Sequence, residues 1–95
     1  MPAAEVTISQ GGRGGFITYR EGTEAAIFEW EIGGSVLALI WGTKKHEWDL
    51  RHPWAKGRQG EIYNFVASEV VRQKAQNSAF EIELESGMIT LLLSD

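Results

Sequence analysis

A chain of 95 residues with 43% hydrophobic and 23% charged side chains has the composition of one ordinary globular domain, which excludes the disordered and fibrous classes. Its nine Lys and Arg residues and 13 Asp and Glu residues give a net charge of -4. Nucleic acids and anionic membranes bind clustered cations, so neither is an expected partner. A basic protein partner suits this charge better.

The sequence contains no cysteine, which excludes disulfides, thiolate metal sites and cysteine nucleophiles. The first residues lack the basic and apolar regions of a secretory signal. The longest apolar run, VLALIW, is far shorter than the roughly 20 residues that a membrane-spanning helix needs. We therefore expect a soluble protein located in the cytoplasm.

Four short segments in the first half of the chain have the composition of β-strands. They are rich in β-branched and aromatic residues, and glycine-containing turns separate them. The predicted strands are 5–9, 16–20, 25–32 and 35–41. Apolar and acidic residues alternate in the third segment, which predicts one face toward the core and one toward solvent. The core-facing set is Ala26, Phe28, Trp30 and Ile32, and the solvent-facing set is Glu29 and Glu31.

The spacing of apolar residues changes after residue 56. Ile62, Val66 and Val70 recur every four residues, which predicts an amphipathic helix over about 56–75. Residues 79–85 alternate again, and a turn then leads into 88–93, which predicts a second hairpin. The order β-β-β-β-α-β-β predicts a single α+β domain over residues 1–95. It consists of an antiparallel sheet of about six strands with one amphipathic helix packed on one face.

Two of the predicted strands, 36–41 and 88–93, are apolar on both faces. Because a helix covers only one face of a sheet, a second cover is expected on the other face. It is either the loop at 43–55, folded back as a lid, or a second copy of the chain in a homodimer. The loop is short and charged, which favours the homodimer.

The same loop is the first candidate site, because Trp, Arg and His often anchor contacts when partly exposed. Its candidate recognition residues are His46, Trp48, Arg51, His52 and Trp54. The tryptophans are also suited to core packing, which is the default interpretation. The spacing of His46, Asp49 and His52 does not match a zinc site, and no acid–base partner for either histidine is evident. We therefore predict no metal site, no catalytic residue and no cofactor.

The second candidate site is a set of carboxylates that alternation places on the solvent side of two predicted strands. They are Glu29, Glu31, Glu81, Glu83 and Glu85. Whether they gather on one surface depends on the strand order, which the sequence leaves open. Such carboxylates either keep strand faces solvated and unaggregated or bind a basic partner.

These features predict a small cytoplasmic protein-interaction module, binding or inhibitor-like and without chemistry of its own, acting as a monomer or a homodimer. The alternative is a small enzyme or ligand-binding domain that uses the loop at 46–54 over a pocket of the sheet. Convergence of His46 and His52 on one cavity with a carboxylate would favour that alternative.

Overall fold

The computed structural model describes residues 3–93 and confirms the predicted α+β architecture. One antiparallel sheet contains the six strands β1 (Ala4–Gly11), β2 (Gly14–Glu21), β3 (Glu24–Ile32), β4 (Ala38–Trp41), β5 (Ala79–Glu83) and β6 (Met88–Leu92). Between β4 and β5 lie helix α1 (Lys45–Arg51), a 3-10 turn η1 (Pro53–Ala55) and helix α2 (Gln59–Lys74). No helix within residues 3–93 is long and apolar enough to cross a membrane.

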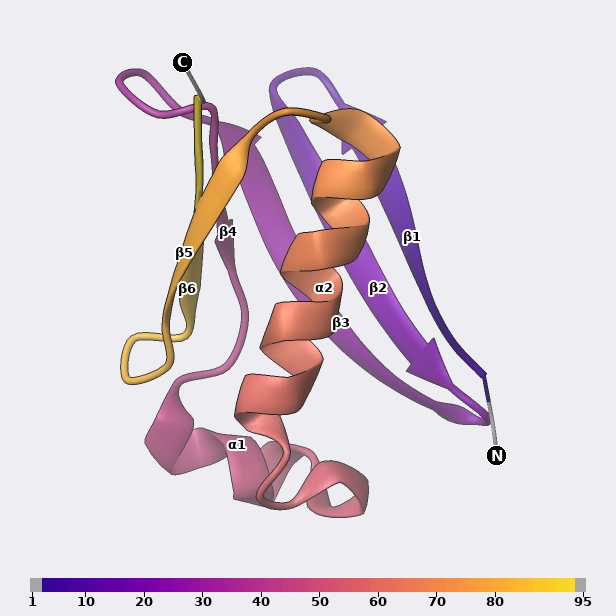
Figure 1. The fold of residues 1–95 in the computed structure, drawn as a ribbon. Coiled ribbons are helices and arrows are strands. Elements are labelled where there is room, and N and C mark those ends of the chain that lie inside the picture. The colour runs from indigo at the N-terminus through magenta and orange to yellow at the C-terminus, as the bar shows by residue number, and fades with distance from the viewer. Residues whose placement is uncertain (1–2, 94–95) are drawn as a thin grey trace.

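The strands are arranged in the order β1-β2-β3-β4-β6-β5, and every neighbouring pair is antiparallel. The first four strands follow one another, whereas β6 pairs with β4 and leaves β5 at the edge. In Figure 1 the sheet curls around α2, and its two edge strands, β1 and β5, both contact that helix. Strands β3 and β5, which carry the predicted acidic residues, are therefore separated by β4 and β6.

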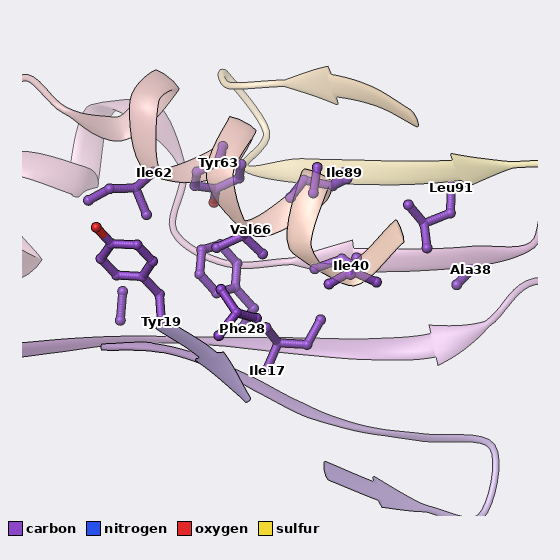
Figure 2. Close-up of a cluster of buried hydrophobic side chains, with 14 of the residues drawn as sticks. Ile17, Tyr19, Phe28, Ala38, Ile40, Ile62, Tyr63, Val66, Ile89 and Leu91 are labelled. Carbon is purple, nitrogen blue, oxygen red and sulfur yellow. The ribbon is translucent and has the colours of Figure 1, made fainter. Parts of the chain in front are cut away.

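The core lies between α2 and the concave face of the sheet. The predicted apolar stripe of the helix is confirmed, since Ile62, Tyr63, Val66, Ala67 and Val70 are all buried. Figure 2 shows Ile62, Tyr63 and Val66 meeting inward-facing residues of the strands, among them Ile17, Tyr19, Phe28, Ile40, Ile89 and Leu91. The alternation predicted for β3 is confirmed in its first part, because Ala26 and Phe28 are buried and the glutamates are exposed. Toward the end of the strand Trp30 is only half-buried, and Ile32 is 42% exposed.

Helix α1 and the turn η1 occupy a segment that the sequence predicted as a loop, so that prediction was wrong. The side chains of Glu47 and Arg51, one helical turn apart, pair at 3.1 Å and suit the helix dipole at the two ends. Pro53 ends the helix, because the residue before a proline avoids helical geometry; His52 has φ -130° and ψ 67°. Only Trp48 of α1 is buried, so the segment shows no apolar period.

Both tyrosines of the chain are buried, and both hydroxyl groups donate hydrogen bonds. The Tyr63 hydroxyl lies 3.0 Å from the backbone oxygens of Thr43 and Gly87, and the Tyr19 hydroxyl lies 2.6 Å from a carboxylate oxygen of Glu21. Burial raises the pKa of each tyrosine to about 12, and the negative charge of Glu21 adds to the effect at Tyr19.

We expect both tyrosines of the folded protein to remain mostly protonated near pH 11, above the ordinary tyrosine pKa of about 10. Because folding raises these pKa values, the stability they contribute is complete below about pH 10 and is lost as the pH rises through about 12. The ultraviolet absorbance of tyrosinate should stay low near pH 11 and rise when urea is added. Tyr19→Phe should halve that rise. Native-state ionisation centred near pH 10 would contradict the prediction.

Candidate functional site

The convex face of the sheet, opposite α2, is open to solvent; we call it the outer face. Phe16 on β2 and Ile27 on β3 point to this face, and their side chains are 52% and 61% exposed. The segment that was expected as a possible lid does not cover this face, because Trp48 of α1 packs into the core on the side of α2. Within residues 3–93, the apolar residues of the outer face therefore have no cover.

The register of the strands arranges part of the outer face into two rows that cross β3, β4, β6 and β5. One row consists of Glu29, Trp41, Met88 and Glu83, and the other of Glu31, Leu39, Thr90 and Glu81. Each row starts and ends with a carboxylate. We call the surface formed by these eight residues the acid-flanked stripe. Neighbouring strands lie about 4.8 Å apart, so the carboxylates on β3 are three strand spacings, about 14 Å, from those on β5.

The acid-flanked stripe carries negative charge without cations on its own strands. Strands β3, β4, β5 and β6 contain no lysine or arginine, and all four carboxylates are exposed. The indole N–H of Trp41 donates to Glu29 at 2.8 Å, which holds the ring on the surface. The apolar residues between these carboxylates, Leu39, Trp41 and Met88, are half-buried. A partly exposed apolar surface flanked by one sign of charge suits a ligand that is both apolar and oppositely charged.

The fifth predicted carboxylate, Glu85, lies apart from this surface. Strand β5 ends at Glu83, and Glu85 falls in the turn that leads to β6. Its carboxylate is 3.7 Å from the ammonium group of Lys45 at the start of α1. The alternation that placed Glu85 with the other carboxylates stops where the strand stops.

The predicted recognition residues of the 46–54 segment do not form one surface. Trp48 is 1% exposed, its indole N–H donates to the backbone oxygen of Ala55 at 2.9 Å, and its ring packs edge-on against Tyr63. His46 is instead exposed and lies 3.4 Å from Glu47. Arg51 is also exposed and contacts the same carboxylate. Trp48 is thus a core residue.

His52 and Trp54 are half-buried and pack against other aromatic rings. His52 stacks on Trp48 with ring centroids 4.1 Å apart, and Trp54 stacks on Tyr19 at 6.3 Å. Burial lowers the pKa of His52, so the neutral imidazole is favoured. His52 and the solvent-exposed His46 therefore have different surroundings and do not share a site. Within residues 3–93, no three His, Cys, Asp or Glu residues are grouped in a way that could hold a metal ion.

A charged cluster that the sequence did not predict joins the end of β2 to the start of α2. The guanidinium of Arg58 donates to both carboxylate oxygens of Glu21, at 2.8 and 3.1 Å, and to Glu61 at 2.7 Å. The hydrogen bonds from Arg58 and Tyr19 lower the pKa of Glu21 to about 2. Glu21 and Arg58 are 37 residues apart, so no local motif could have revealed the pair. The cluster contains two carboxylates and one guanidinium, and the hydrogen bonds of Arg58 link the start of α2 to the sheet.

Of the predicted site residues, the structure thus brings together four carboxylates, on both sides of the apolar centre of the acid-flanked stripe. No protein-family model, curated protein or solved structure matches this chain. A proposal about function therefore rests on the geometry and charge of the chain itself.

Proposed function

We propose that this chain is a cytoplasmic protein-interaction module whose acid-flanked stripe binds a basic amphipathic helix of a partner protein. The observation that supports the proposal is the pair of cross-sheet rows, in which β4 and β6 present the apolar centre between exposed carboxylates on β3 and β5. The absence of cysteine is consistent with a reducing compartment such as the cytoplasm.

The width of the stripe suits a helix. An α-helix with its side chains is about 10–12 Å across, and the carboxylates on β3 are about 14 Å from those on β5. A helix lying along β4 and β6 would place its apolar side on Leu39, Trp41 and Met88. Lysine or arginine residues on either flank would then reach the carboxylates of β3 and β5. Amphipathic helices commonly bind apolar grooves in this way.

Charge favours such a partner over a second copy of the chain. A face-to-face homodimer would bring together the four carboxylates of each copy, and like charges in close proximity are destabilising. A homodimer through this face would also join two chains that each carry a net charge of -4. A basic helix meets both requirements of the stripe, since it covers the apolar centre and neutralises the flanks.

The proposal can be tested with a synthetic helical peptide of about four turns, with leucines on one side and lysines on both flanks. We expect saturable binding that changes the fluorescence of Trp41. This fluorescence change should be absent in a Trp41→Phe variant. A scrambled peptide of equal composition keeps the charge but loses the apolar side, so it should bind at least tenfold more weakly. Equal binding of both peptides would mean that charge alone drives association, and would refute the proposal.

Charge reversal on the stripe provides a second test. Glu81→Lys or Glu83→Lys should change the free energy of unfolding by no more than about 0.5 kcal/mol, because both side chains are exposed. Either change should weaken binding of the basic peptide several-fold. Glu24→Lys is the matched control, since it makes the same charge change at an exposed position outside the stripe. Strong destabilisation by Glu81→Lys, or equal weakening by Glu24→Lys, would contradict the prediction.

Sedimentation distinguishes binding of a different partner from self-association of the chain. We expect a monomer at micromolar concentration. A dimer that Leu39→Lys converts to monomers would instead assign the stripe to self-association, and would refute the proposed hetero-partner.

A further inference from the structure

A separate cavity lies on the other side of the sheet, between the C-terminal end of α2 and the strands beneath it. Its volume is about 250 Å³, and apart from Gln10 and Lys74 every residue that lines it is apolar. Ile8, Ile17 and Ile40 contribute from the sheet, and Val70 contributes from the helix. The cavity shares no residue with the acid-flanked stripe, so an inference about it is independent of the proposed function.

One wall of the cavity is held in place by a hydrogen bond. The indole N–H of Trp30, which lines the cavity, donates to the backbone oxygen of Ser9 at 3.0 Å. Gly15 lies between Gln10 and Trp30 in the sheet, and a Cβ atom there would collide with that same oxygen. The indole thus crosses a position that only glycine can occupy. A fixed wall favours binding, because less ordering is needed when a ligand enters.

The charge at the cavity is positive, although the chain as a whole is acidic. Lys74 is the only charged residue in the lining, and its side chain is exposed to solvent, which places it at the mouth. Lysine side chains commonly lay their carbon stem along apolar surface and keep the ammonium in water. No carboxylate within residues 3–93 forms an ion pair with Lys74. An anionic group at the mouth would therefore meet a cation.

From this arrangement we infer that the cavity binds a small apolar carboxylic acid, with its hydrocarbon part inside and its carboxylate beside Lys74. A cavity of about 150 Å³ lined by apolar side chains holds a benzene ring. On that scale, 250 Å³ accommodates roughly eight to ten carbon atoms. Gln10, the other polar residue of the lining, is exposed. Its amide nitrogen donates one hydrogen to the backbone oxygen of Gly12 at 3.1 Å and has a second hydrogen for the same carboxylate.

The test is a titration of the full chain with octanoate, octanol and octylammonium, followed through the indole N–H resonances in a nitrogen–proton NMR spectrum. Octanoate should shift the Trp30 resonance saturably and leave that of Trp41 on the outer face unchanged. Octanol should bind several-fold more weakly, and octylammonium more weakly still. If octanoate gives no saturable shift at Trp30, or shifts Trp41 instead, the cavity is not the binding site and the inference fails.

Two variants separate the roles of charge and volume. Lys74→Met should lower the affinity for octanoate about three- to fivefold, the size of one solvent-exposed ion pair, and leave octanol binding unchanged. Ala75→Leu should fill part of the cavity and weaken both ligands, with folding checked by circular dichroism. Because Lys74 is exposed, Lys74→Met keeps the fold and decides the outcome even if Ala75→Leu does not fold. Unchanged octanoate affinity in Lys74→Met would overturn the inference.

Discussion

Val66→Asp is expected to unfold the domain. Val66 is 0% exposed and lies on the core-facing stripe of α2, one turn after Ile62 and one turn before Val70. Figure 2 shows it pointing toward the apolar residues of the sheet. Aspartate there would either bury an unpaired carboxylate or force the helix away from the sheet, at a cost of several kcal/mol. A domain of this size is stable by only about 5–15 kcal/mol.

The measurement is thermal unfolding followed by circular dichroism. We expect Val66→Asp to lose the cooperative transition, and Ser68→Asp to keep it within about 0.5 kcal/mol of the original stability. The serine lies on the exposed side of the same helix, so the control introduces the same residue into the same element. A cooperative transition unchanged by Val66→Asp would mean that this side of α2 does not pack on the sheet.

Elements with a regular apolar period were predictable from the sequence. The recurrence of Ile62, Val66 and Val70 fixed the buried side of α2, and the alternation around Phe28 fixed the two faces of β3. Each pattern repeats several times within one element, so local sequence alone carries the information. The predicted ends were less accurate, because the helix begins at Gln59 rather than near residue 56.

The strand order could not be predicted in the same way. Pairing of β6 with β4 depends on contacts between residues about 50 positions apart, such as Ile40 with Ile89. The acidic residues were therefore identified as solvent-facing, but their arrangement on both sides of an apolar centre became evident only from the register. The pair between Glu21 and Arg58 was missed for the same reason, since neither residue has a distinctive local context.

Trp48→Ala is the second substitution with a large expected effect, about 3–5 kcal/mol of lost stability in urea unfolding. Trp48 is 1% exposed, and its removal would leave a cavity beside Tyr63. The backbone oxygen of Ala55, itself a buried residue, would lose the indole donor at 2.9 Å and keep only the backbone N–H of Arg58. Trp48→Phe keeps an aromatic ring and loses the indole N–H, so it should cost clearly less. Leu50→Ala, at an 83% exposed position of the same helix, is the control and should change stability by less than about 0.5 kcal/mol.

The same substitution should also change the titration of His52, whose ring stacks on Trp48. Burial lowers the pKa of His52 in the folded chain, so its contribution to stability is present above the ordinary value near 6.5 and is lost as the pH falls below it. Removing the indole exposes the imidazole, and its pKa should rise toward 6.5 when followed by proton NMR. If Trp48→Ala left both the stability and the His52 titration unchanged, Trp48 would not be a core residue, and the 46–54 segment would again be a candidate recognition surface.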